Sequence, residues 1–306
     1  MANARKNLYL GIDIGGSNTK IVVIASSTKL RASGKNIKIL EKINFKTPHE
    51  RKSLVGILDN HIDFFENKYN IKFLKIGIAV AGVLNSSRTR ILNSPNMPKL
   101  NGFALQDALY KKKPRKYVMN NDANIFVYAE AVAGVARGSK RVIGLTLGTG
   151  VGSGYFVDGK IETGAHGGAS EIGHSVIVAN GIKCTCGGRG HVEDYISSRF
   201  FHRNGGASAQ KLAVLARQGN KRAKKIFDDM AFYLGCALAN IVNFWDPEVI
   251  VIGGGIAEES DMFLKKAVSI AKANILSPEA AGALKVRRDK LGPYAGAIGS
   301  ALVVMK

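Results

Sequence analysis

The sequence Leu145-Thr146-Leu147-Gly148-Thr149-Gly150-Val151-Gly152-Ser153-Gly154 leads an apolar run into a turn with glycine at every second position. Residues 142–147 are β-prone, and Tyr155-Phe156-Val157 follows the glycines, so the stretch predicts a β-hairpin. Glycines this dense allow positive φ and leave room for backbone N–H groups to surround an anion. A tight hairpin without a ligand has the same composition, so this stretch alone leaves both interpretations open.

A second stretch near the N-terminus has the same layout. Residues 8–14 form an apolar run with Asp13 near its end, and Gly15-Gly16-Ser17 leads into a second run from Ile21 to Ala25. Two such hairpins can hold a polyphosphate from opposite sides. Asp13 would then hold water on Mg²⁺, which proteins bind through one or two carboxylates plus phosphate oxygens. The pair resembles the two phosphate loops of the superfamily of sugar kinases, actin and heat-shock ATPases.

Bulk properties favour a cytoplasmic protein of about two domains. The chain has 306 residues, of which 46% are hydrophobic, which is enough for a sizeable core. We expect no transmembrane helix, because no apolar run approaches about 18 residues. Residues 1–7 are basic but pass directly into the strand that carries Asp13, so we expect no signal peptide. Three cysteines are too few and too local for a disulfide framework, which favours a reducing compartment.

The net charge of +21 favours anionic partners such as nucleotides, sugar phosphates or polyphosphate. The basic residues are scattered along the chain, and the densest cluster, residues 111–116, lies between a predicted helix and a predicted strand. No recognition helix or RNA-binding signature accompanies the charge. We therefore interpret it as a solvated lysine-rich surface and do not expect nucleic acid as a partner.

Strands and helices alternate along the chain, which predicts an α/β fold. The predicted strands after the first hairpin are residues 37–45, 74–82, 117–119, 142–147, 176–178 and 248–256, and the predicted helices are 49–69, 103–110, 124–136, 209–243 and 295–304. Between one strand and the next helix stands Asn121-Asp122-Ala123-Asn124. One of these side chains is expected to cap the helix, and one carboxylate there can be a general base.

The order of these motifs resembles the ROK family, which comprises repressors, uncharacterised reading frames and sugar kinases. The resemblance extends over nearly the whole chain. Its motifs are residues 13–20, Pro95-Asn96, residues 121–124, 147–154 and 164–174, the cysteine pair Cys184 and Cys186, and Gly253-Gly254-Gly255.

The resemblance implies an ATP- and Mg²⁺-dependent hexose kinase with two actin-like (ribonuclease H-like) domains and an active site in the cleft between them. The implied domains are residues 1–120, completed by a C-terminal helix at about 292–306, and residues 121–291. Asp122 matches the catalytic base that accepts the proton of the sugar 6-hydroxyl, in a reaction that depends on positioning and charge stabilisation. The implied cofactor-binding residues are Asp13, Gly15, Gly16, Ser17, Gly148, Thr149, Gly150, Gly253, Gly254 and Gly255. Lys20 either reaches a phosphate or has a surface role.

The implied sugar ligands are Asn96, Asn121, Asp122, Glu171, His174 and Glu193. Buried carboxylates and amides that pair with sugar hydroxyls reject analogues lacking a hydroxyl better than an apolar pocket does. Glu171 and His174 could instead be a helix cap and a solvated imidazole at the end of a loop; the accompanying motifs favour the functional interpretation.

ROK kinases often carry zinc on a histidine and three cysteines. This chain has His174, Cys184 and Cys186 in place, but His191 stands where the third cysteine is usual. Two cysteines and two histidines still make a good tetrahedral site. The alternatives are two free thiols in a metal-free loop, or a lost site whose loop is held by packing alone. The zinc would be structural and would hold the loop that carries Glu171 and Glu193.

Glucose is the leading substrate. N-acetylmannosamine or N-acetylglucosamine is the first rival, because the same family motifs serve all three and the sequence does not show what faces the 2-position. Polyphosphate is the rival phosphate donor. A different function, sugar-responsive transcription regulation, needs a helix-turn-helix ahead of the kinase-like part, and the 12 residues before Asp13 favour a kinase. A homodimer is common among similar proteins and is expected here.

Overall fold

The computed structural model describes residues 8–26 and 37–305, so the segment 1–7, for which we expect no signal peptide, lies outside it. The chain divides into two compact units. Unit 1 comprises residues 1–138, 163–169 and 293–306, and unit 2 comprises residues 139–162 and 170–292. Residues 121–138 therefore pack in unit 1, whereas the sequence suggested a boundary near residue 120, because the helix that begins at Asp122 packs on the C-terminal helix of the same unit.

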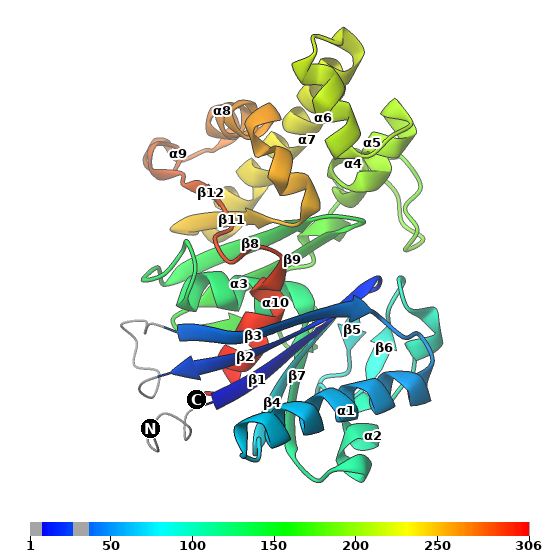
Figure 1. Ribbon diagram of the computed structural model, residues 1–306. Helices are drawn as coiled ribbons and strands as arrows, with labels where there is room; N and C mark the ends of the chain where they lie inside the picture. The colour runs from blue at the N-terminus through cyan, green and yellow to red at the C-terminus, as the bar shows by residue number, and fades with distance from the viewer. Residues whose placement is uncertain (1–7, 27–36, 306) are drawn as a thin grey trace. The chain divides into compact units, whose positions relative to one another are not determined.

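Unit 1 contains a five-stranded sheet in the order β3-β2-β1-β4-β7 (Figure 1). Neighbouring strands are antiparallel among β3, β2 and β1 and parallel among β1, β4 and β7. Its strands are β1 (Leu8–Ile14), β2 (Asn18–Ser26), β3 (Ile37–Lys46), β4 (Lys75–Val80) and β7 (Lys116–Asn121), and a separate ribbon pairs β5 (Val83–Leu84) with β6 (Ile91–Asn93).

Helices cover both faces of this sheet, and the alternation of side chains along β1 explains why. Leu10, Ile12 and Ile14 are fully buried in one apolar cluster with residues of α1 (Arg51–Tyr69) and α2 (Leu105–Lys112). Gly11 and Asp13 point to the opposite face, where α10 (Ala295–Val303) packs on β1 and β4 and against α3 (Asp122–Val132), as Figure 1 shows. The C-terminal helix thus completes unit 1.

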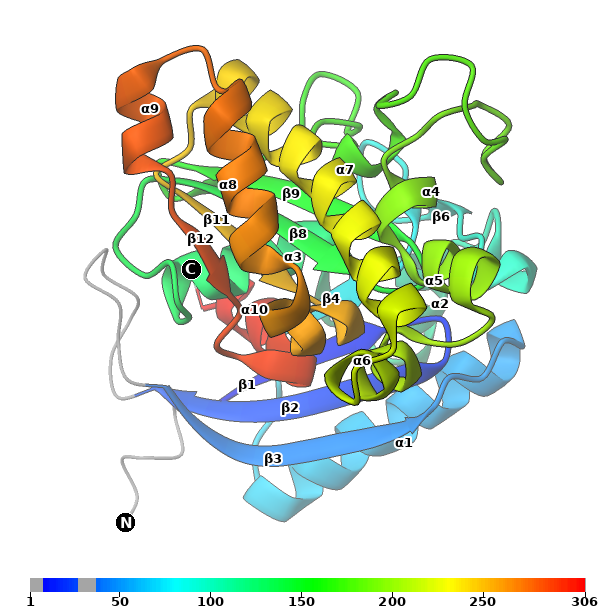
Figure 2. The same cartoon turned by 90° about the horizontal axis from the view of Figure 1, so that it is seen from above.

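Unit 2 repeats the same sheet in the order β10-β9-β8-β11-β12, again antiparallel on one side of the first strand and parallel on the other. Its strands are β8 (Arg141–Leu147), β9 (Val151–Val157), β10 (Lys160–Glu162), β11 (Val249–Gly253) and β12 (Val286–Arg288). Its helices are α4 (Glu193–Ile196), α5 (Ser198–Gly205), α6 (Ala209–Arg217), α7 (Lys221–Trp245), α8 (Leu264–Asn274) and α9 (Pro278–Ala283). The long α7 and α8 lie side by side in Figure 2. The α/β fold class is confirmed.

Three details differ from the sequence prediction. The predicted strand 176–178 is wrong: only Val176 forms a single bridge, with His191, because the segment belongs to an irregular loop. The predicted helix 209–243 is two helices, since Asn220 caps a new helix by accepting from the Ala223 N–H at 2.9 Å. The helix after Asp122 ends at Val132 and not near residue 136. In the part of the chain that the structure describes, no helix combines the length and apolarity needed to cross a membrane.

Candidate active site

The carboxyl ends of three parallel strands meet at one edge of the unit 1 sheet. The register pairs Asp13 of β1 with Ala79 of β4, and Ala79 with Asn120 of β7. The turns after these strands are therefore neighbours, and ligands of α/β sheets bind at this edge. The first glycine turn contacts Asn96 as well, because a Cβ on Gly16 would lie 2.6 Å from the Asn96 Cβ. Unit 1 thus brings its predicted phosphate turn and its predicted sugar ligands together.

Asn121 and Asp122 form the junction between β7 and α3. Asn121 is the helix cap: its Oδ1 accepts from the N–H groups of Ala123 at 2.9 Å and Asn124 at 3.1 Å. Its Nδ2 donates to the carbonyl of Gly82 at 3.1 Å, which ties β7 to the turn after β4. Asp122 is half-buried, and its Oδ1 accepts from the Ala123 N–H at 3.0 Å. The carboxylate predicted as the base is therefore held in a capped helix start.

Asp13 is the most strongly perturbed carboxyl in this set. Burial raises its pKa to about 6, and Lys20, its cross-strand partner on β2, opposes the increase. Gly296 of α10 makes room for the carboxylate, since a Cβ there would lie 2.6 Å from Asp13 Oδ2. Lys20 therefore lies opposite Asp13, the predicted Mg²⁺ ligand.

The glycine hairpin between β8 and β9 is the corresponding turn of unit 2. The Gly148 N–H donates to the Gly150 carbonyl at 3.0 Å, which closes the turn. Neither glycine has positive φ, so the turn does not use the conformation that its glycines allow. Gly150 is required for a different reason: a Cβ there would collide with the carboxylate of Glu193. Close approach, and not backbone freedom, explains the glycine.

The predicted sugar carboxylates of unit 2 are attached to the same hairpin. Glu193 is buried, and its Oε2 accepts from the Val151 N–H at 2.8 Å. Ser153 of β9 donates to the Ser170 carbonyl and accepts from the Ile172 N–H at 3.0 Å, which holds the loop beside Glu171. Desolvation raises the pKa of Glu171, His174 opposes the increase, and Glu193 adds to it.

The last glycine motif also lies beside this hairpin. Gly253 of β11 pairs with Thr146 of β8, so the turn that follows stands next to the hairpin turn. Gly254 has φ of 89°, a left-handed conformation that favours glycine. Gln210 at the start of α6 donates to the Gly255 carbonyl at 2.8 Å. The two phosphate- and nucleotide-binding motifs predicted for unit 2 are therefore adjacent.

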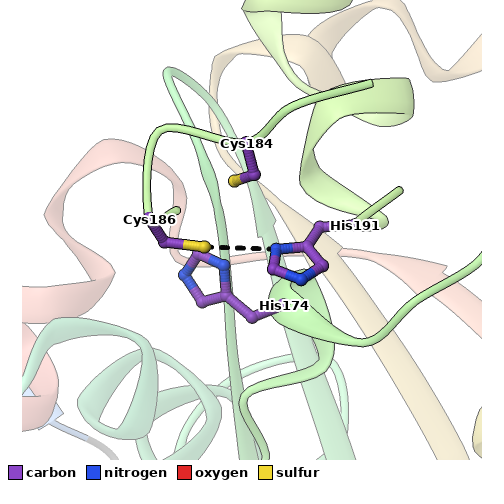
Figure 3. Close-up of side chains that lie close together, drawn as sticks. All are labelled: His174, Cys184, Cys186 and His191. Carbon is purple, nitrogen blue, oxygen red and sulfur yellow. Dashed lines mark hydrogen bonds between the residues drawn. The ribbon is translucent and has the colours of Figure 1, made fainter. Parts of the chain in front are cut away.

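The four predicted metal ligands converge in one loop of unit 2, and their side chains point toward one another in Figure 3. The ligand atoms of His174, Cys184, Cys186 and His191 all lie within 4.8 Å of one another. The Cys186 Sγ is 3.2 Å from His191 Nδ1. A tetrahedral zinc site needs ligand atoms about 3.3–3.8 Å apart, given the Zn–S and Zn–N bond lengths. Two thiols and two imidazoles at this spacing suit zinc, and His191 takes the place of a third cysteine.

These sites follow the motif order of one family, and a model of the ROK family matches residues 9–306. The chain belongs to the ROK family. This ROK protein is 30% identical over 318 residues to a glucokinase from Thermotoga maritima, with 96% of each chain covered. It is 32% identical over 270 residues to the N-acetylgalactosamine kinase AgaK from Shewanella sp. strain ANA-3. That alignment covers 83% of this chain and 84% of the relative.

Solved structures agree with the fold of this ROK protein. The crystal structure of a ROK family glucokinase from Streptomyces griseus in complex with glucose and AMPPNP matches with a TM-score of 0.79 at 26% identity. The match covers 97% of this chain and 99% of that one. The family and the actin-like fold predicted from the sequence are thereby confirmed.

Sequence reasoning missed two residues that hold the first phosphate turn. Thr47 donates from its hydroxyl to the Gly15 carbonyl at 2.6 Å and from its N–H to the Ser17 carbonyl at 3.0 Å. His49 donates from Nε2 to the Gly16 carbonyl at 2.8 Å. These partners lie 32 and 33 residues beyond the turn in sequence, so no local motif marks them. They fix the turn through the carbonyls of Gly15, Gly16 and Ser17.

The raised pKa of Asp13 in this ROK protein predicts a cost in stability. A carboxyl whose pKa increases from 3.8 to about 6 on folding binds its proton more tightly in the folded state. The contribution of Asp13 to the free energy of unfolding therefore decreases as the pH rises from about 4 to about 6 and is constant above that range. We expect Asp13→Asn to be more stable than wild type by about 1–3 kcal/mol at pH 7, with the difference lost below pH 4.

Urea unfolding of both proteins at pH 4 and pH 7 measures this. Asp107→Asn, at an exposed position of α2, is the control and should leave the pH dependence unchanged. An Asp13→Asn gain that is the same at both pH values would show that the buried charge is not its source.

Proposed function

We propose that this protein phosphorylates a hexose at its 6-hydroxyl from ATP and Mg²⁺, with glucose as the leading substrate. The observation that carries the proposal is the position of Asp122. It stands at the first residue of α3, at the same sheet edge as Asp13 and the Gly15-Gly16 turn, in a chain that aligns with 96% of the length of a glucokinase relative. A carboxylate next to a phosphate turn is the arrangement that phosphoryl transfer to an alcohol needs.

Each group has a defined role in the proposed reaction. Asp122 accepts the proton of the 6-hydroxyl as its oxygen attacks the γ-phosphorus and the bond to the β-phosphate oxygen breaks, which leaves ADP. Ionised Asp13 would hold Mg²⁺, and the backbone N–H groups of the two glycine hairpins would bind phosphate oxygens. Mg²⁺ supplies charge neutralisation on the phosphates. Asp13 is predominantly ionised at pH 7, because its pKa of about 6 lies below that pH.

We propose six residues as the sugar ligands: Asn96, Asn121, Asp122, Glu171, His174 and Glu193. Carboxylates in this set accept hydrogen bonds from sugar hydroxyls and make binding dependent on each hydroxyl. We propose that the second ring nitrogen of His174 serves the sugar while the first ligates zinc.

N-acetylhexosamines are the second candidate substrates, and a specific observation favours them. The relative with 32% identity is named as an N-acetylgalactosamine kinase, so the family scaffold accommodates an N-acetyl group at the 2-position. Polyphosphate remains the alternative donor. The Gly254 turn beside the phosphate hairpin supports a nucleotide, since it offers a site for the adenosine that polyphosphate lacks.

We propose a structural zinc ion on His174, Cys184, Cys186 and His191. Backbone hydrogen bonds shape the loop, including Cys184 N–H to the Gly188 carbonyl at 2.8 Å, and the four ligand atoms lie within 4.8 Å of one another. Zinc here would keep the Glu171 and Glu193 segments in one arrangement. None of the three cysteines forms a disulfide, which suits the reducing cytoplasm, where we propose that the enzyme acts. We also propose that it is a homodimer.

A substrate panel tests the function. Glucose, mannose and three N-acetylhexosamines are each assayed with ATP and with polyphosphate, with Mg²⁺ or with EDTA, and phosphate transfer is followed by coupled ADP release and by the sugar phosphate formed. We expect the highest kcat/KM with glucose and MgATP, the phosphate on the 6-hydroxyl, and no turnover with EDTA. Transfer to none of the sugars would refute the proposal, and a preference for an N-acetylhexosamine would replace glucose as the substrate.

A further inference from the structure

The carboxylate of Glu193 is held from two sides by other parts of unit 2. Its Oε2 accepts from the Val151 N–H at the end of the phosphate hairpin. Its Oε1 accepts from the guanidinium of Arg199 on α5. Each carboxylate oxygen offers two acceptor sites, so Glu193 can still accept from a sugar hydroxyl in this position. The two bonds set the direction in which that remaining acceptor points.

Arg199 also contacts the loop of the metal ligands. Its other terminal nitrogen, NH1, donates to Thr185 Oγ1 at 2.5 Å, and Thr185 stands between Cys184 and Cys186. One guanidinium therefore bridges the metal-ligand loop and Glu193. The helix that carries it is anchored too, because the N–H of Ser198 donates to the Gly148 carbonyl at 2.8 Å. The backbone on which Arg199 stands is thus fixed to the phosphate hairpin.

The chemistry of this bridge requires arginine. A planar guanidinium presents its donors in a rigid fork and can donate to two acceptors at once. The ammonium of lysine is a compact charge on a flexible chain and does not hold two acceptors in a fixed geometry. Glu193 is buried, so the loss of its cationic partner leaves a carboxylate that is free to turn away from its present direction toward water. Such a turn removes the aimed acceptor that a sugar hydroxyl would meet.

We propose that Arg199 is a positioning residue: it aims Glu193 at the hexose and couples that aim to the metal-ligand loop through Thr185. The proposal rests on the proposed hexose kinase function and adds a specificity role that neither the zinc ligands nor the sugar ligands supply by themselves.

The test compares the KM for glucose, the KM for MgATP and kcat in wild type, Arg199→Gln, Arg199→Lys, Thr185→Val and the double variant Arg199→Gln/Thr185→Val. We expect Arg199→Gln to raise the KM for glucose by about tenfold to a hundredfold, because a charged hydrogen bond to a buried group is lost, while the KM for MgATP changes less than about threefold. Arg199→Lys should fall between it and wild type.

The double variant separates positioning from simple destabilisation. Thr185→Val alone should raise the KM for glucose by about threefold, and it should add nothing when Arg199 is already Gln, because its effect passes through the guanidinium. Calorimetric titration of glucose without nucleotide should show the same ranking. Arg203→Gln is the matched control: it removes an arginine one turn along α5 that donates to the Asp194 carbonyl at 2.5 Å, and both KM values should stay at the wild-type level.

The outcomes distinguish the two proposals. Suppose that wild type phosphorylates glucose. An unchanged glucose KM in Arg199→Gln, or additive effects in the double variant, would then overturn the positioning role and leave the proposed function standing. A wild type that phosphorylates no hexose refutes the proposed function and the positioning role with it. If Arg199→Gln does not fold, Thr185→Val tests the proposal, because residue 185 is exposed. A wild-type KM for glucose in that variant would overturn the coupling between Glu193 and the metal-ligand loop.

Discussion

Asp122→Asn is expected to lower kcat for hexose phosphorylation by about a hundredfold to ten-thousandfold, the usual contribution of a positioned general base. The amide keeps an oxygen that can accept the Ala123 N–H, which lies 3.0 Å from Asp122 Oδ1, so the start of α3 should be unchanged. Sugar binding should therefore survive within about threefold, since shape and hydrogen bonding persist while basicity is lost. Single-turnover rates and calorimetric titration of the sugar measure the two quantities separately.

The control for this variant is Asp107→Asn, which removes an exposed carboxylate from α2 of the same unit and should leave kcat at the wild-type level. If Asp122→Asn lost sugar binding together with turnover, Asp122 would be a sugar ligand only. If it retained full turnover, another group would be the base, and the assignment of the sheet edge of unit 1 as the catalytic site would be wrong.

Cys184→Ser is expected to remove the metal. Purified wild type should contain about one zinc ion per chain, and the variant less than about 0.2, because a hydroxyl is a much poorer zinc ligand than a thiolate and three ligands hold a structural zinc weakly. Elemental analysis after dialysis against a weak chelator measures the content. The glucose KM should increase in the same variant, since the loop that carries Glu171 and adjoins Glu193 loses its anchor.

Cys236→Ser supplies the matched control. Cys236 is a half-buried cysteine in α7 and is not one of the clustered ligands, so its replacement should leave the zinc content unchanged. His191→Cys provides the converse test, since it restores the ligand set common in the family and should hold zinc at least as well. An unchanged zinc content in Cys184→Ser, or no zinc in wild type, would remove the metal proposal.

Local patterns in the sequence predicted the strands and helices near the site well. The apolar run in residues 8–14 predicted β1, and the polar cluster after residue 119 predicted a capped helix start, which is where Asn121 caps α3. These features depend on neighbours within a few residues, so they are readable from the chain alone. The segment 176–178 was predicted to be a strand, but only Val176 pairs, through a single bridge to His191 on the other side of the loop.

The sequence by itself determined the family, the α/β fold class and the motifs that could bind phosphate, sugar and metal, because each rests on residue type and short spacing. Only the tertiary structure decided which groups meet. Burial raised the pKa of Asp13, and Thr47 and His49 reached the first turn from residues 32 and 33 positions away. Arg199 joined Glu193 to Thr185 across the metal-ligand loop. Thr47 and His49 come from a segment far along the chain, and the Arg199 contacts depend on the path of an irregular loop, so no short-spacing pattern encodes either.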